Sequence, residues 1–273
     1  MQQPPLTRII KHLEDELGTL LLKRLPRGVE ATEAGQALYQ EALTILAHAD
    51  AIPRRVQNIA RGLEGQINIG FTNSVGLHSF LPRLLRNFRE SFPAVSINLN
   101  EDGSNSLIDS VINEKNDIVF LRKPAPIGLG LISFHVLDEP LIVALPNNHA
   151  LADAEGELHL LDLEGYDFVL YRRLAGQDLF DSILASCYQA GFSPKIVQEA
   201  PRLTSSLNLI AAGIGLSIVP EAIRDFWNKQ IVYKTLRADP PCVAPIYAVY
   251  KTGADHARLK YLLECLKQPE FIS

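Results

Sequence analysis

The sequence predicts an α/β protein with two lobes, preceded by a small helix–strand–turn–strand unit and a long linking helix. Three observations carry this prediction. Strand and helix patterns alternate from residue 66 onward, apolar residues recur with a coiled-coil period between residues 38 and 63, and the first 32 residues combine an amphipathic helix with a tight turn. We expect domains at 1–32, 33–64 and 65–273, with lobe I at about 65–138 and 243–273 and lobe II at about 139–242.

The first 18 residues have the pattern of an amphipathic helix. Apolar residues recur at spacings of three and four, at Leu6, Ile9, Ile10, Leu13 and Leu17. Pro4 and Pro5 suit the entry to a helix, and Gly18 suits its end. The other face carries Gln3, Thr7, Arg8 and Lys11, which are donor-rich side chains of the kind that contact phosphates and base edges. Taken alone, this segment fits an ordinary surface helix with solvated charges better.

The residues that follow change that interpretation. Thr19 to Arg24 reads as a strand, Pro26-Arg27-Gly28-Val29 as a tight turn leading into a second strand, and a helix begins near Glu33. This is the order of a winged helix, and Arg27 at the tip of the turn suits a phosphate or minor-groove contact. The residues expected to contact DNA are therefore Gln3, Pro4, Pro5, Thr7, Arg8, Lys11 and Arg27.

Glu33 to about Gly62 reads as one long helix with an apolar seam. Alternating spacings of four and three connect Leu38, Ala42, Ile45, Ala49, Ile52, Val56, Ile59 and Leu63. A seam of this period is typical of a coiled coil, so we expect the helix to pair two subunits. The alternative is a single amphipathic helix packed on its own domain. Pro53 removes a helical hydrogen bond, which predicts a bend or break between Asp50 and Pro53.

Composition and charge narrow the class of protein. The chain has 26 Lys and Arg against 31 Asp and Glu, a net charge of −5, which argues against nucleic-acid binding along its whole length. Up to Arg27, however, five basic residues oppose three acidic ones. There is no signal-peptide pattern and no long apolar run, and the three cysteines are scattered. We expect a cytoplasmic protein with no membrane span, metal or cofactor.

From residue 66 the pattern becomes β-α-β-α-β. We expect strands at 66–71, 95–100 and 117–121, with helices at 80–92 and 104–115 between them. A second such unit has strands near 141–144, 168–171, 196–199 and 216–219, with helices at 178–190 and 203–212. A strand at 246–250 and a helix at 255–266 return to the first unit. Two such open sheets side by side predict a cleft between the lobes.

Ligands of open parallel sheets lie beyond the carboxyl ends of the strands, so the residues there are the candidates for a binding site. Three strand-to-helix turns are rich in small polar residues: Thr72-Asn73-Ser74, Gly103-Ser104-Asn105 and Leu203-Thr204-Ser205-Ser206. Each Ser or Thr could equally be a helix cap. Arg122 follows one strand, and Arg172 and Arg173 follow Tyr171 at the end of another. An arginine at such a position can bind a ligand carboxylate through two parallel hydrogen bonds. The alternative is that it forms a surface ion pair.

The segment QQPPLTRIIKHLEDELGTLLLKRLPRGVEATEAG resembles the winged helix-turn-helix of LysR-type transcriptional regulators, and Gly213 to Pro220 resembles a second motif of that family. The resemblance implies an effector domain similar to periplasmic solute-binding proteins, and a homodimer or homotetramer on DNA. It also implies a small organic acid effector, because Ser74, Ser104 and Arg122 match positions used by members that bind aromatic or dicarboxylic acids.

The resemblance also implies a longer DNA-binding domain than residues 1–32 provide. Family members carry roughly 25 to 30 further residues before this point, a helix and a half. We therefore expect either a misassigned start or a truncated product. The alternative function is a stand-alone small-molecule-binding dimer without competent DNA binding. An enzyme is disfavoured, because the sequence has no nucleophile elbow, zinc-protease motif, phosphate loop or dinucleotide fingerprint.

Overall fold

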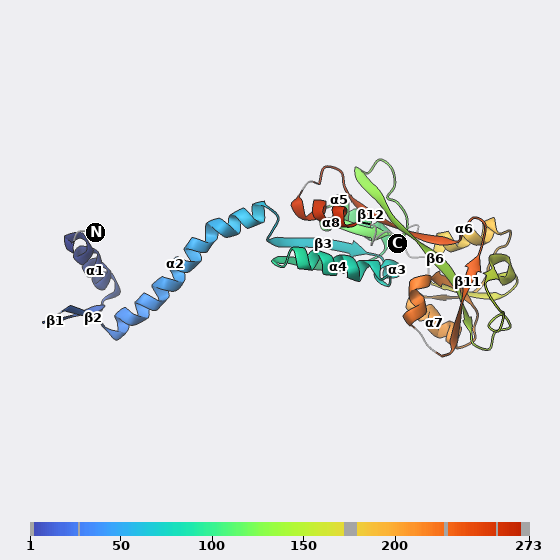
Figure 1. Ribbon diagram of the computed structural model, residues 1–273, viewed down its shortest axis with the longest axis horizontal. Helices are drawn as coiled ribbons and strands as arrows, with labels where there is room; N and C mark the ends of the chain where they lie inside the picture. Colours follow the sequence, from blue (N-terminus) through green and yellow to red (C-terminus); the bar gives the residue numbers. More distant parts are fainter. Residues whose placement is uncertain (1–2, 27, 172–178, 227–228, 255, 269–273) are drawn as a thin grey trace. The chain divides into compact units, whose positions relative to one another are not determined.

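The computed structural model describes residues 3–26, 28–171, 179–226, 229–254 and 256–268 (Figure 1). The chain divides into two compact units, Met1–Arg61 and Gly62–Ser273. None of the described helices combines the length and the apolar character that crossing a membrane requires.

The first unit has the order expected of a wing between two helices. Helix α1 spans Gln3–Leu17, strands β1 (Leu22–Leu25) and β2 (Gly28–Ala31) pair antiparallel, and helix α2 spans Glu33–Ala60. Glu14 joins α1 to the wing, because its Oε1 accepts hydrogen bonds from the backbone N–H groups of Leu21 (2.8 Å) and Leu22 (3.1 Å).

The junction between the wing and α2 depends on two small residues. Thr32 caps α2: its Oγ1 accepts from the Gly35 N–H (3.0 Å) and donates to the Leu20 carbonyl (2.7 Å). Gly35 lies so close to the wing that a Cβ there would be 2.1 Å from the Leu21 carbonyl oxygen. These contacts explain why Thr32 and Gly35 are needed at this point of the sequence.

Helix α2 is long and unburied. It runs for 28 residues without ending at Pro53, and none of its residues is buried (Figure 1). The expected seam therefore lies on the surface, with Ile45 at 66% and Ile52 and Val56 at 60% exposure. A helix that exposes this much apolar surface has no partner for that surface among the described residues of its own unit.

The second unit begins with alternating strands and helices, whose strands run parallel and form most of lobe I. Its elements are β3 (Gly65–Phe71), α3 (Asn73–Gly76), α4 (Phe80–Ser91), β4 (Val95–Glu101), α5 (Ser104–Ile112) and β5 (Ile118–Leu121). Strands β4, β3 and β5 lie in that order and run parallel, as the β-α-β-α-β pattern predicts. Helix α5 ends at Ile112, earlier than expected, and Glu114 then takes a positive φ of 57°.

The remaining elements form lobe II and the strands that join the lobes, except for the last helix, which returns to lobe I. They are β6 (Leu131–Pro146), β7 (Leu158–His159), η1 (Leu160–Leu163), β8 (Asp167–Tyr171), α6 (Leu179–Gln189), β9 (Lys195–Ala200), α7 (Leu203–Ala211), β10 (Ser217–Pro220), η2 (Glu221–Phe226), β11 (Ile231–Arg237), β12 (Val243–Lys251) and α8 (Ala257–Cys265). Strand β11 was not expected from the sequence. It pairs with β6 antiparallel and with β7 parallel.

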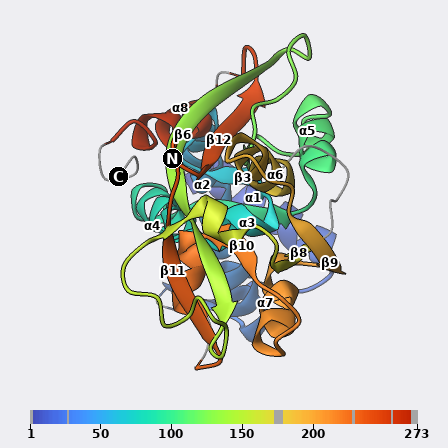
Figure 2. The ribbon, with the colours of Figure 1, turned by 90° about the vertical axis from the view of Figure 1, so that its right-hand side faces the viewer.

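The long strand β6 connects the two lobes. Its first part, Leu131 to Pro140, pairs with β12 in lobe I, and its second part, Leu141 to Pro146, pairs with β10 and β11 in lobe II. Figure 2 shows β6 running from the part of the unit that holds α5 and β12 to the part that holds α7. The sequence predicted only residues 141–144, because polar residues interrupt the apolar pattern before them.

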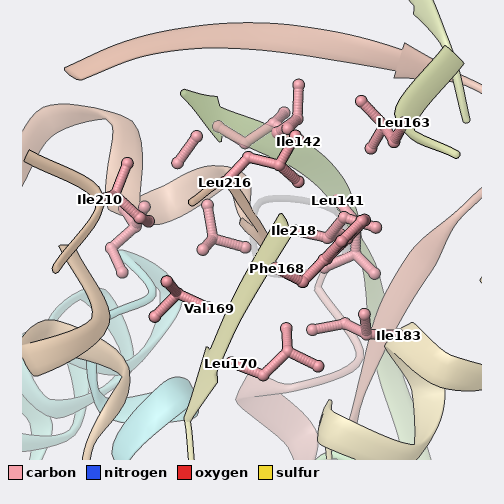
Figure 3. Packing of buried hydrophobic residues seen from close by; sticks show 14 of the residues in the cluster. Leu141, Ile142, Leu163, Phe168, Val169, Leu170, Ile183, Ile210, Leu216 and Ile218 are labelled. Atoms are coloured by element: carbon pink, nitrogen blue, oxygen red, sulfur yellow. The ribbon is translucent and has the colours of Figure 1, made fainter. Parts of the chain in front are cut away.

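Each lobe has its own hydrophobic core. In lobe I, strands β3 and β5 are buried against α4 and α8 through residues such as Ile67, Phe88 and Leu262. In lobe II, Phe168, Val169 and Leu170 of β8 lie at the centre of the core (Figure 3). The packed strands β3 and β8 are held by these cores, and the more exposed strands β4 and β9 pair parallel with them, which fixes the carboxyl ends of all four.

Candidate functional site

A cleft of about 270 Å³ lies between the two lobes, at the carboxyl ends of four strands. Thr72, Asn73 and Ser74 line it after β3, and Glu101, Asp102, Gly103 and Ser104 line it at the end of β4. Tyr171 at the end of β8 and Pro201, Arg202 and Leu203 after β9 complete the lining from lobe II. This is the place where an open parallel sheet presents a ligand site, and the volume suits a small molecule.

The lobe I wall presents buried hydroxyl groups. Thr72 and Ser104 are 7% and 6% exposed, and neither hydroxyl oxygen has a hydrogen-bond partner within the described part of the chain. Ser74 is also buried, and its Oγ accepts a hydrogen bond from Arg122 Nε (3.2 Å), which leaves its own hydroxyl proton to donate. Buried polar groups are costly without a partner, so these hydroxyls indicate a polar ligand.

Two helices begin at the cleft without a side-chain cap. Helix α5 follows Gly103 and helix α7 follows Arg202, and neither N-cap residue makes a side-chain capping bond. Each helix is nine residues long. The free N–H groups of a helix N-terminus and its partial positive charge favour an anion. Each lobe therefore contributes one helix N-terminus, with its partial positive charge, to the same cleft.

The mouth of the cleft carries both signs of charge. Arg202 Nη1 lies 3.6 Å from Glu101 Oε1, and the same Oε1 accepts from Asn73 Nδ2 at 3.1 Å. Asp102 turns back on its own loop, where its Oδ1 accepts from the Gly103 N–H (2.7 Å). The Arg202 and Glu101 side chains are 67% and 40% exposed, so water screens their attraction.

Several of the residues expected at a ligand site line this cleft. They are Thr72, Asn73, Ser74, Ser104 and Tyr171. Asn105 and Thr204 are exposed and lie outside the lining, one residue further along α5 and α7, while Arg172 and Arg173 lie outside the described residues. Sequence reasoning missed Glu101, Asp102 and Arg202. The signal was available, because Asp102 and Arg202 are adjacent in sequence to turns that were singled out, and Glu101 directly precedes Asp102.

Arg122, also expected at the ligand site, is not among the residues that line the cleft. Its side chain is fully buried, with Nη2 2.6 Å from Glu139 Oε2, and it donates to the Ser74 carbonyl (2.8 Å) and to the Ala244 carbonyl (2.9 Å). The hydrogen bonds and the ion pair of this guanidinium are therefore made within the protein itself. Arg122 instead belongs to a buried ion pair at the junction of the lobes.

That junction joins elements of both lobes. Glu139 lies on β6, is 2% exposed, and its Oε1 accepts from the Ala222 N–H of η2 (2.8 Å). Nearby, burial lowers the pKa of His78, an effect that the Glu139 carboxylate opposes. His78 Nδ1 accepts from the Phe80 N–H (3.1 Å), so this hydrogen bond and burial both favour the neutral ring.

The expected DNA-contacting residues lie in the first unit. Thr7, Arg8 and Lys11 are exposed on α1. Gln3, Pro4 and Pro5 form the first turn of α1, and Arg27 lies outside the described residues. Arg8 also borders a shallow groove on α1, together with Ile9, His12, Leu13 and Glu16. Across the described residues, no group of His, Cys, Asp or Glu side chains is arranged to hold a metal ion.

Comparison with known proteins gives consistent matches over nearly the whole chain. The family model "LysR substrate binding domain" matches residues 60–269, and the model "Bacterial regulatory helix-turn-helix protein, lysR family" matches residues 1–36. The HTH-type transcriptional regulator BudR of Raoultella terrigena is 33% identical over 223 residues, which are 82% of this chain and 77% of BudR. BenM of Acinetobacter baylyi is 30% identical over 268 residues, 97% of this chain and 86% of BenM.

A solved structure matches over the same range. Full-length CbnR in complex with its target DNA superposes with a TM-score of 0.77 at 25% identity, covering 98% of this chain and 90% of that one. The match includes both units of the present chain, the wing with its two helices and the two-lobed body.

Proposed function

This chain belongs to the LysR family of bacterial transcriptional regulators, and we propose on that premise that a small organic anion bound in the interlobe cleft modulates its activity. It is a DNA-binding transcriptional regulator with an effector-binding domain, not an enzyme. We place its action in the cytoplasm, where it would meet DNA.

One observation carries the choice of an anion. Helices α5 and α7, which lack side-chain caps, begin at one cleft that also holds the hydroxyls of Thr72 and Ser104, which have no hydrogen-bond partner among the described residues. Free N–H groups only donate hydrogen bonds, hydroxyls can donate as well as accept them, and an ionised carboxylate only accepts them. The ligand that satisfies this set at the least cost is a small carboxylate.

Calorimetric titration with carboxylates tests this. Acetate, benzoate and succinate are the probes, and benzamide serves as a neutral counterpart of benzoate. At least one acid should bind, and Ser104→Ala should weaken it about 10- to 100-fold, because a hydrogen bond to a charged group is lost. Ser106→Ala, an exposed position on the same helix, is the matched control. Failure of every acid to bind, or equal affinity for benzamide, would refute the anion.

The DNA contacts are proposed for one face of α1 and the wing tip. We propose that Thr7, Arg8 and Lys11 contact DNA, with Gln3, Pro4 and Pro5 at the start of α1 and Arg27 in the wing. The exposure of Thr7, Arg8 and Lys11 supports this. Each phosphate contact contributes about one unit to the slope of log affinity against log salt concentration.

The slope is therefore the quantity to measure. Arg8→Ala with Lys11→Ala should reduce it by about two in fluorescence anisotropy with a promoter fragment. Lys115→Ala, an exposed cation in the effector unit, is the control and should leave it unchanged. An unchanged slope in the double variant would contradict these contacts.

Assembly is the third part of the proposal. The exposed apolar seam on α2 supports a homodimer, or a homotetramer built from dimers. Apolar residues at this spacing become buried when two such helices pair. Ile45→Asp with Ile52→Asp should convert the assembly to monomer in analytical ultracentrifugation. Gln40→Asp with Gln57→Asp, two changes off the seam, should not. A dimer that survives the seam variant would place the interface elsewhere.

A further inference from the structure

We infer that Arg202 is a specificity-determining residue for the charge of the effector, and that the Glu101 carboxylate competes with the effector for the Arg202 guanidinium. The inference rests on the proposed function, since it concerns the anion of the same cleft. Arg202 and Glu101 lie outside the small polar turns that the sequence analysis singled out, so their roles follow only from the structure.

The geometry supports competition. Glu101 ends β4 in lobe I and Arg202 precedes α7 in lobe II, so their 3.6 Å approach spans the mouth of the cleft. The same Glu101 oxygen accepts from Asn73 Nδ2 at 3.1 Å. One carboxylate oxygen of the chain therefore faces two cleft-lining donors, which is the position that an oxygen of a bound carboxylate would take.

The competitor is weakly held. The separation of 3.6 Å is an ion pair without a short hydrogen bond, and both side chains are partly exposed. An incoming carboxylate can reach what Glu101 does not: the hydroxyls of Thr72 and Ser104, which have no partner among the described residues, and the α5 N-terminus. It would therefore displace Glu101 from Arg202 at small cost.

This arrangement discriminates by charge. A neutral ligand of the same shape cannot replace the Glu101 carboxylate, so it leaves the Arg202–Glu101 pair intact and gains nothing from it. An anion gains the Arg202 attraction and frees Glu101 to water. Charge selection then depends on a pair that is separated by 101 positions in the sequence and comes together only at the cleft.

The test is a double-variant cycle, read by calorimetric titration of acetate, benzoate and succinate. Glu101→Gln should tighten the acid that binds wild type by about threefold, because it removes the competitor. Arg202→Gln should weaken it by about five- to tenfold, because a charged contact is lost. In the double variant the gain from Glu101→Gln should fall to less than half, since Glu101 acts through Arg202.

A neighbouring acid supplies the control. Asp102→Asn removes the same charge from the cleft lining, but Asp102 is turned to the Gly103 N–H. It should change affinity by clearly less than Glu101→Gln. An equal effect of the two would show general electrostatics and overturn the inference, as would a full gain from Glu101→Gln in the Arg202→Gln background.

The outcomes also separate this inference from the proposed function. If wild type binds no acid, the anion proposal fails and the inference fails with it. If wild type binds an acid and Ser104→Ala weakens it, while Glu101→Gln and Arg202→Gln leave the dissociation constant unchanged, the anion site stands and only the inference is overturned.

Discussion

Replacing Arg122 with methionine should destabilise the effector unit by about 3–5 kcal/mol, the usual cost of removing one partner from a buried ion pair. The reason lies in what remains. Glu139 is 2% exposed and would keep a carboxylate oxygen without its cation. The carbonyls of Ser74 and Ala244 would each lose a guanidinium donor as well. A shorter, uncharged side chain restores none of these bonds.

Urea unfolding followed by circular dichroism measures the loss as a lower midpoint at an unchanged slope. Arg202→Met is the matched control, because the same change at a side chain 67% exposed should alter the free energy of unfolding by about 0.5 kcal/mol or less. The loss in Arg122→Met should also be smaller at acidic pH than at neutral pH, since a lone buried carboxylate escapes its cost by taking up a proton.

Two results would refute this reasoning. A loss below about 1 kcal/mol would mean that water reaches Glu139 and that the pair is not buried in solution. A large loss with no dependence on pH would assign the effect to the cavity left by the shorter side chain rather than to the unpaired charge.

Three further predictions concern other parts of the chain. Burial holds the pKa of His78 below its usual 6.5, so stability should be lost as pH falls below that value, and His78→Gln should flatten this part of the unfolding profile. Gly35→Ala should cost about 1–3 kcal/mol because its Cβ would meet the Leu21 carbonyl, and faster proteolysis of the full chain between residues 18 and 32 measures this. Burial raises the pKa of Cys187 to about 12, and the other two cysteines are also buried, so Ellman's reagent should label none of them before unfolding; labelling in the native state would contradict this burial.

Local patterns in the sequence were enough for most elements. The alternation of strands and helices after residue 66 predicted the parallel order of β4, β3 and β5, because buried strands and amphipathic helices differ in period. The α2 helix followed in the same way from its apolar spacing, and it continues through Pro53. Thr72, Ser74 and Ser104 could be placed near one edge because parallel strands end on the same side.

The direction of a side chain could not be read from such patterns. Arg122 follows its strand as predicted, yet its guanidinium turns inward to Glu139 on β6 and to Ala244 on β12, which the sheet brings beside β5. The first half of β6 was missed for a related reason: residues such as Glu139 are polar, and their burial depends on partners distant in sequence.

The sequence by itself determined the family, the order of helices and strands, and the turns that border the cleft, since these depend on residues close together in the chain. Only the tertiary structure decided which charges meet. Glu101 faces Arg202 across the cleft, and Arg122 pairs with Glu139 beneath it. Coulomb attraction and hydrogen bonding act over a few ångströms, so these pairings are set by the packing of strands and helices and not by position in the chain.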